Sequence, residues 1–159
     1  EEIATCSPVL FALAFAILHE LRHVMFRKAC DAPAGVSAEE MLCDIWARDV
    51  MTAKMANYSQ ETGNTFAEVG QKRATGIALA AIIVHTMTAQ SVRWGTEEYP
   101  PIADRLTAMI AGYSLPENSN FWLFTACLLV ATLRQDRVPL EVSEHSYKAM
   151  VETLLDRLR

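Results

Sequence analysis

An apolar run from Pro8 to Leu18 leads directly into His19-Glu20-Leu21-Arg22-His23, and this combination constrains the fold more than any other stretch of the chain. The run predicts a buried helix that continues through both histidines. Histidines four positions apart on a helix share one face, so both imidazoles can bind one cation. Glu20 lies about a third of a turn further round, close enough to hold a water molecule at that cation. This arrangement of two histidines and a glutamate is typical of zinc-dependent peptidases.

The same pattern can also arise by chance. Both histidines are then ordinary helix residues, and Glu20 is a solvated charge. A buried apolar helix seldom carries such polar groups unless a partner offsets their desolvation. A metal would do so, and we therefore favour the zinc interpretation.

The chain has 159 residues, which predicts a single domain, 1–159, with a hydrophobic core of its own. Its longest apolar stretches are Pro8–Leu18, Ile77–Val84 and Phe121–Leu133. Each is shorter than the roughly 18 to 20 residues of a membrane span, so we expect buried helices and no membrane insertion. The first and third stretches would also suit packing against something outside this chain.

The net charge of −5, without a basic cluster, argues against nucleic acid as a partner. The cysteines Cys6, Cys30, Cys43 and Cys127 are scattered, which favours free thiols in a reducing, cytoplasmic compartment. No signal peptide is recognisable. Because the chain begins at Glu1 without a methionine, we expect it to be the C-terminal portion of a longer protein.

Helical patterns cover nearly the whole chain, and no alternating strand pattern is found. They predict an all-α bundle of about six helices around the helix that carries the histidines, a zincin-like arrangement. The expected helices are 7–29, 37–58 with Ser37 as N-cap, 66–92, one from Pro101 to about Gly112, one from Asn118 or Ser119 to Gln135, and one capped by Ser143 that ends at Leu158.

A catalytic zinc usually takes three protein ligands, and the second helix supplies candidates. Glu40 and Asp44 lie one turn apart, so their carboxylates share a face. Glu40 fits a third ligand, with Asp44 accepting a hydrogen bond from the far nitrogen of a ligating histidine. Alternatively, Ser37 and Glu40 form a capping box, and Glu39 is a favourable charge at the helix N-terminus. Because a helical hairpin would return this helix beside the histidines, we favour Glu40 over Glu39 or Asp44 as the ligand.

Together, these residues carry a family resemblance. The segment His19-Glu-Leu-Arg-His23 followed by Glu40-Met-Leu-Cys-Asp44-Ile-Trp-Ala-Arg-Asp resembles gluzincin metallopeptidases, and in particular Lit-type phage-exclusion peptidases, together with the later Arg73-Ala-Thr-Gly76-Ile. The resemblance implies zinc bound by His19, His23 and Glu40. It further implies cleavage of a host protein in bacterial defence, with an activating peptide or protein as a partner.

A more distant likeness is to the HtpX and CAAX-endopeptidase group, in which a later His-Pro…Arg element supports the site. This chain has Tyr99-Pro100-Pro101-Ile-Ala-Asp-Arg105 in that place. Tyr99 replaces the family's histidine, while Arg105 matches its arginine and is implied to hold a carboxylate or the substrate carbonyl.

The mechanism that follows uses Glu20 as general base towards water activated by zinc, and later as proton donor to the leaving amine. Arg105, Tyr99 and His85 are candidates for stabilising the oxyanion, in no fixed order. A buried His85 bonded to backbone is the alternative for that residue. Arg73 is expected to pair with Glu68 or Asp44. No strand that could bind substrate by main-chain pairing is predicted.

Two other functions remain open at this point. The high apolar content also suits a membrane-associated peptidase of the HtpX kind. A helical interaction module with a purely structural zinc would need a fourth protein ligand, for which Cys43 is the nearest thiol in sequence.

Overall fold

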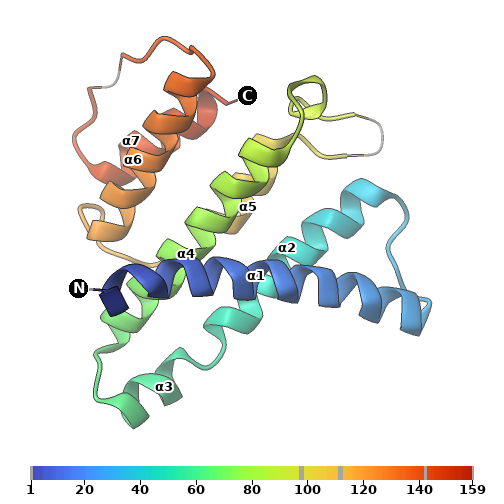
Figure 1. The fold of residues 1–159 in the computed structure, drawn as a ribbon, viewed down its shortest axis with the longest axis horizontal. Coiled ribbons are helices and arrows are strands. Elements are labelled where there is room, and N and C mark those ends of the chain that lie inside the picture. Colours follow the sequence, from blue (N-terminus) through green and yellow to red (C-terminus); the bar gives the residue numbers. More distant parts are fainter. Residues whose placement is uncertain (1, 97–98, 111–112, 142, 159) are drawn as a thin grey trace.

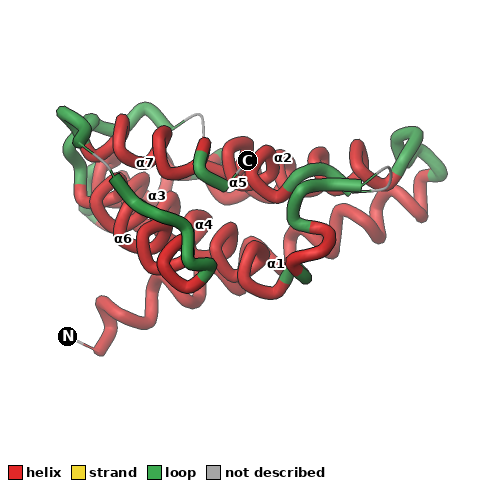
Figure 2. The backbone as a smooth tube through the Cα atoms, turned by 90° about the horizontal axis from the view of Figure 1, so that it is seen from above, coloured by secondary structure: helices red, strands yellow, loops and turns green. Residues whose placement is uncertain are grey.

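The computed structural model describes residues 2–96, 99–110, 113–141 and 143–158, with side chains from Ser7 onwards. Within these ranges the fold is entirely helical and contains no strand, which confirms the all-α prediction (Figure 2). The elements are α1 (Glu2–Ala29), α2 (Val36–Thr52), α3 (Met55–Thr62), α4 (Phe66–Met87), the 3₁₀ helix η1 (Gln90–Val92), α5 (Ile102–Ile110), α6 (Asn120–Gln135) and α7 (Tyr147–Asp156).

The central element is α4, which packs against α1, α2, α3, α5 and α6. In Figure 1, α1 crosses in front of α4, and α6 lies beside α7. The face of α4 in the core is rich in small residues, and its Gly76 lies against Phe11 of α1 so closely that a Cβ atom would overlap the Phe11 side chain. Gly76 therefore permits the close crossing of α1 and α4.

Several helix boundaries differ from the sequence prediction. The expected helix 37–58 is divided, because α2 ends at Thr52 and α3 begins at Met55. Gly35, with φ of 94°, precedes α2, so Ser37 lies inside the helix and does not cap it. The helix expected over 66–92 ends at Met87, and Thr65 with Glu68 forms the capping box at its start.

In the second half of the chain, one predicted helix start is correct and one predicted cap is wrong. Ser119 directly precedes α6, as expected. The C-terminal helix is capped by Ser146, whose hydroxyl accepts a hydrogen bond from the Ala149 amide, and not by Ser143. Pro101 lies immediately before α5; the expected end of this helix near Gly112 lies outside the described residues.

The apolar N-terminal helix is not buried as predicted. Ala12 and Phe15 face the core, but Leu10, Leu13 and Ile17 are 62%, 56% and 60% exposed. Within the segment Ser7–Ala29, only 22% of the most apolar 18 residues are buried, and the length of the segment and the mean hydropathy of 1.6 are sufficient to cross a membrane. The prediction was wrong because one face of α1 packs on α2 and α4, while the opposite face is exposed.

Candidate metal centre

The two motif histidines lie where α1 and α2 pack against each other. The helices form a hairpin whose turn uses two left-handed residues, Cys30 (φ 55°) and Gly35 (φ 94°). This turn brings the first half of α2 back alongside the histidine-bearing face of α1. The apolar part of α1 that precedes the histidines packs on α4. This packing fixes the position of both histidines in the bundle.

The imidazoles of His19 and His23 converge with the carboxylate of Glu40. Their Nε2 atoms are 3.1 Å apart, and Glu40 approaches them with Oε2 at 3.5 Å and Oε1 at 3.4 Å, respectively. Ligands placed about 2.0–2.1 Å from a tetrahedral zinc are about 3.3–3.4 Å from one another. The observed separations therefore fit the donor spacing of a zinc site.

The far nitrogen of each imidazole faces a carboxylate of α2. His19 Nδ1 lies 2.9 Å from Asp44 Oδ1, a short contact that is not aligned as a linear hydrogen bond, and His23 Nδ1 lies 2.6 Å from Glu39 Oε1. Such partners orient ligating histidines and fix their tautomer. Asp44 thus lies beside the far nitrogen of a histidine, as predicted, but without the aligned hydrogen bond that the prediction specified. Glu39, considered from sequence only as a rival ligand or a helix-end charge, is the equivalent partner of His23.

Arg105 of α5 contacts two of the carboxylates of the site, those of Asp44 and Glu40. Its guanidinium donates to both oxygens of Asp44, at 2.7 and 3.1 Å, and lies 3.1 Å from Glu40. Asp44 is fully buried, and an unpaired charge there would be costly. Of the two roles implied for Arg105, holding a carboxylate is therefore the one that this geometry supports.

The charges of the centre shift the pKa values of its members. Burial alone would lower the pKa of His19, but its contacts with Asp44 and Glu40 outweigh burial and raise the pKa to about 9. The pKa of Glu40 is lowered, chiefly by its hydrogen bond with His19 and despite its own burial. The centre is therefore electrostatically suited to a cation, and its set of two imidazoles and a carboxylate fits the preferences of zinc.

The remaining predicted site residues do not belong to the group of converging ligand atoms. Glu20 is exposed on α1 beside the histidines, and no described residue pairs with its carboxylate. Tyr99 is 45% exposed in the loop before α5, where its main chain pairs with Thr96. His85 is buried and contacts the Asp136 carboxylate rather than backbone.

One further expectation requires correction, and one alternative can be compared with the structure. Arg73 donates to the main-chain oxygen of Met51 and lies 5.4 Å from the Tyr58 ring centre, so it does not pair with Glu68 or Asp44. Cys43, the thiol considered for a structural zinc, is buried, and burial raises the pKa of its thiol to about 12. It does not belong to the group of described residues that could hold a metal.

Among the other cysteines, Cys30 and Cys127 are free and exposed, and the Cys6 side chain lies outside the described part. The only group of described residues that could hold a metal consists of His19, His23 and Glu40. The cysteine ligand required by a structural zinc is therefore not found in the part of the chain that the structure describes.

Comparison with known proteins yields one match. The family model described as Peptidase U49 matches residues 2–125, which include α1 to α5, the first part of α6 and every residue of the cluster. No curated protein and no solved structure matches the chain.

Proposed function

The chain belongs to the peptidase U49 family, and from this membership we propose that it is a zinc-dependent metallopeptidase of the gluzincin type, acting on a peptide bond of a protein substrate. The observation that carries the proposal is the convergence of His19, His23 and Glu40 on one point. Each imidazole also has a carboxylate at its far nitrogen. Chance placement of two histidines does not require this second set of partners.

In this proposal His19, His23 and Glu40 hold the metal through their Nε2 atoms and carboxylate. When bound, zinc supplies a Lewis acid that activates water and polarises the scissile carbonyl. Asp44 and Glu39 keep each Nδ1 protonated, so that each Nε2 presents its lone pair to the metal. Arg105 is a positioning residue, because its guanidinium fixes the carboxylates of Glu40 and Asp44.

Glu20 is proposed as the general base that takes a proton from water and passes it to the leaving amine. Glu20 directly follows His19 on α1 and is exposed, and its carboxylate is not engaged by any described residue. Of the candidates for stabilising the oxyanion, Arg105 and His85 are engaged by carboxylates. The phenol of Tyr99 is therefore the proposed donor.

Replacing Glu20 by glutamine tests the proposal directly. General-base catalysis contributes about 10²- to 10⁴-fold to rate, so Glu20→Gln is expected to lose at least that factor in peptide hydrolysis while retaining zinc. A matched control is Glu61→Gln, which changes an exposed glutamate of α3 and should hydrolyse peptides at the wild-type rate. Turnover retained by Glu20→Gln would refute the mechanism.

We further propose that the enzyme works in the cytoplasm in phage exclusion, cleaving a host protein once an activating peptide or protein is present. The sequence resemblance to Lit-type peptidases motivates this role. Cells that produce the wild-type chain should plate a susceptible phage poorly, whereas cells with Glu20→Gln should plate it normally. Equal plating efficiency of every tested phage on both strains would contradict the role in defence, but it would not contradict the peptidase proposal.

A membrane-associated peptidase is the second candidate, favoured by the exposed apolar face of α1. Its members include Leu10, Leu13, Ile17, Leu21 and Val24, all between 46% and 62% exposed. Flotation with phosphatidylcholine vesicles distinguishes the two candidates. A membrane-associated enzyme floats, and the double variant Leu13→Lys, Ile17→Lys does not; a cytoplasmic enzyme stays in the dense fraction.

A further inference from the structure

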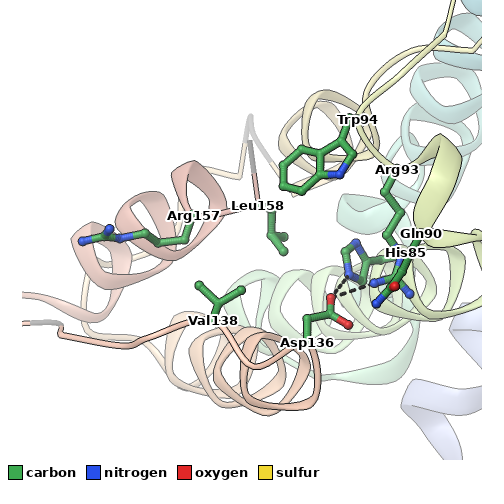
Figure 3. A pocket seen from close by; sticks show the side chains of 8 residues that line it. All are labelled: His85, Gln90, Arg93, Trp94, Asp136, Val138, Arg157 and Leu158. Carbon is green, nitrogen blue, oxygen red and sulfur yellow. Dashed lines mark hydrogen bonds and ion pairs between the residues drawn. The ribbon is translucent and has the colours of Figure 1, made fainter.

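A second site lies at the end of α4 remote in sequence from the metal ligands. Here the C-terminal ends of α4 and α6, with η1 and the end of α7, enclose a cavity of about 260 Å³ (Figure 3). None of its lining residues belongs to the metal centre. The site therefore calls for a separate explanation.

The polar floor of the cavity is the imidazole of His85. It is 2% exposed, and its Nε2 lies 3.1 Å from Asp136 Oδ2. Burial, the largest influence, lowers the pKa of His85, so the ring is neutral at physiological pH. The pKa of Asp136 is also lowered, its contacts with His85 and Arg93 outweighing its burial. Because an ionised carboxylate can only accept hydrogen bonds, Nε2 carries the proton and Nδ1 carries a lone pair.

That lone pair has no hydrogen-bond partner among the described residues. In Figure 3, Asp136 lies on one side of the His85 ring, and the opposite side is turned towards Trp94. Buried acceptors in folded proteins are almost always satisfied. An unsatisfied acceptor in the wall of a cavity is therefore evidence for a molecule that brings a donor.

The other residues that line the cavity restrict the kind of molecule that it can bind. Arg93 lies 2.7 Å from Asp136, so this carboxylate is already neutralised. Arg157 also lines the cavity, but in Figure 3 its guanidinium points away from His85 and Asp136. Val138 and Leu158 provide apolar surface, and the Trp94 indole, 65% exposed, borders the opening. The volume lies below the roughly 300–1,000 Å³ of drug-sized sites, so a single ring system fills it.

We propose that this cavity binds a neutral aromatic ring carrying one O–H or N–H donor, a phenol or an indole. The donor bonds to His85 Nδ1, and the ring packs between Trp94 and the apolar wall of Val138 and Leu158. The same chemistry is presented by a free small aromatic and by a tyrosine or tryptophan side chain of a polypeptide. The inference does not depend on the proposed peptidase activity.

Titration of the full chain with phenol tests this, followed through the ¹⁵N signal of His85 Nδ1. We expect a saturable shift with phenol and none with benzene, which has the ring but lacks the donor. Trp94→Ala should weaken phenol binding at least tenfold. Met87→Ala, a change at a still more exposed apolar residue that does not line the cavity, should bind as the wild type does.

The two sources are separated with N-acetyl-L-tyrosinamide. Binding at least as tight as that of phenol supports the cavity and identifies a polypeptide side chain as the ligand. Binding of phenol alone supports the cavity and identifies a free aromatic. Equal binding of phenol and benzene, no saturable shift, or an unchanged affinity in Trp94→Ala would each overturn the proposal. Because Trp94 is largely exposed, its variant does not depend on refolding of the core.

Discussion

The metal centre and the His85 cavity both contain a buried imidazole next to a carboxylate, yet the pKa values of the two histidines shift in opposite directions. Around His19, two carboxylates overcome the effect of burial, and the pKa rises to about 9. Around His85, the one carboxylate is shared with Arg93, and the pKa falls. The comparison shows that the number of carboxylates in contact with the imidazole, set against its burial, decides whether such a pocket suits a cation or a neutral group.

The difference also extends to the arginines. Arg105 pairs with two carboxylates, one of them fully buried, whereas Arg93 pairs with Asp136 at a site that is 20% exposed. Removing an arginine from a buried ion-pair network destabilises the fold more than removing one from a solvent-exposed ion pair. The following predictions test this comparison from the largest expected effect to the smallest.

Removing the arginine of each site should separate them most clearly. Arg105→Met leaves Asp44 as an uncompensated buried charge, and we expect a loss of about 3–5 kcal/mol in the free energy of unfolding. The matched change, Arg93→Met, should cost about 1 kcal/mol or less, because water reaches Asp136. Urea denaturation of both variants without metal measures this. Equal losses would mean that the two networks contribute alike.

Removing the carboxylate behind a histidine should affect metal binding at one site only. Glu39→Gln leaves all three ligands in place but weakens the partner of His23, so zinc affinity should fall about 10- to 100-fold. Asp136→Asn, the corresponding change at His85, should leave zinc affinity unaltered. Competition with a chromophoric chelator gives both values. Unchanged zinc affinity in Glu39→Gln would show that Glu39 does not orient a ligand.

The pH dependence of stability provides the smallest effect. His85 has a lowered pKa in the folded chain, so its contribution to stability is complete above the unfolded pKa of about 6.5 and is lost as pH falls through the folded value. The wild type should therefore lose stability relative to His85→Gln as pH decreases from 7 to 5. Thermal denaturation of both proteins over this range checks the sign, and a growing advantage of the wild type would contradict it.

What the sequence predicted correctly depends on local spacing. The histidines at i and i+4, and Glu40 with Asp44 at the same interval, share helix faces whatever the tertiary fold. A hairpin was enough to expect them to meet. The all-helical class follows equally from the long apolar patterns and the absence of alternation. These features depend on the helix repeat alone.

What the sequence missed depends on tertiary placement. Whether Glu39 reaches His23 is decided by the alignment of α1 with α2, and His85 meets Asp136 across 51 positions of the chain. The N-cap expected at Ser37 is wrong because Gly35 precedes the helix, and Glu40 contacts Arg105 and the histidines instead of forming the alternative capping box. Hydropathy shows that α1 favours burial, but it does not show whether anything covers its outer face.

The most direct test of the central claim is the zinc content of the purified chain beside His23→Ala, Glu40→Ala and His85→Gln. The account predicts about one zinc per chain in the wild type and in His85→Gln, and loss of zinc in the other two. A wild-type chain that holds no zinc after zinc is supplied would contradict the metal centre. Zinc retained by Glu40→Ala would contradict its third ligand.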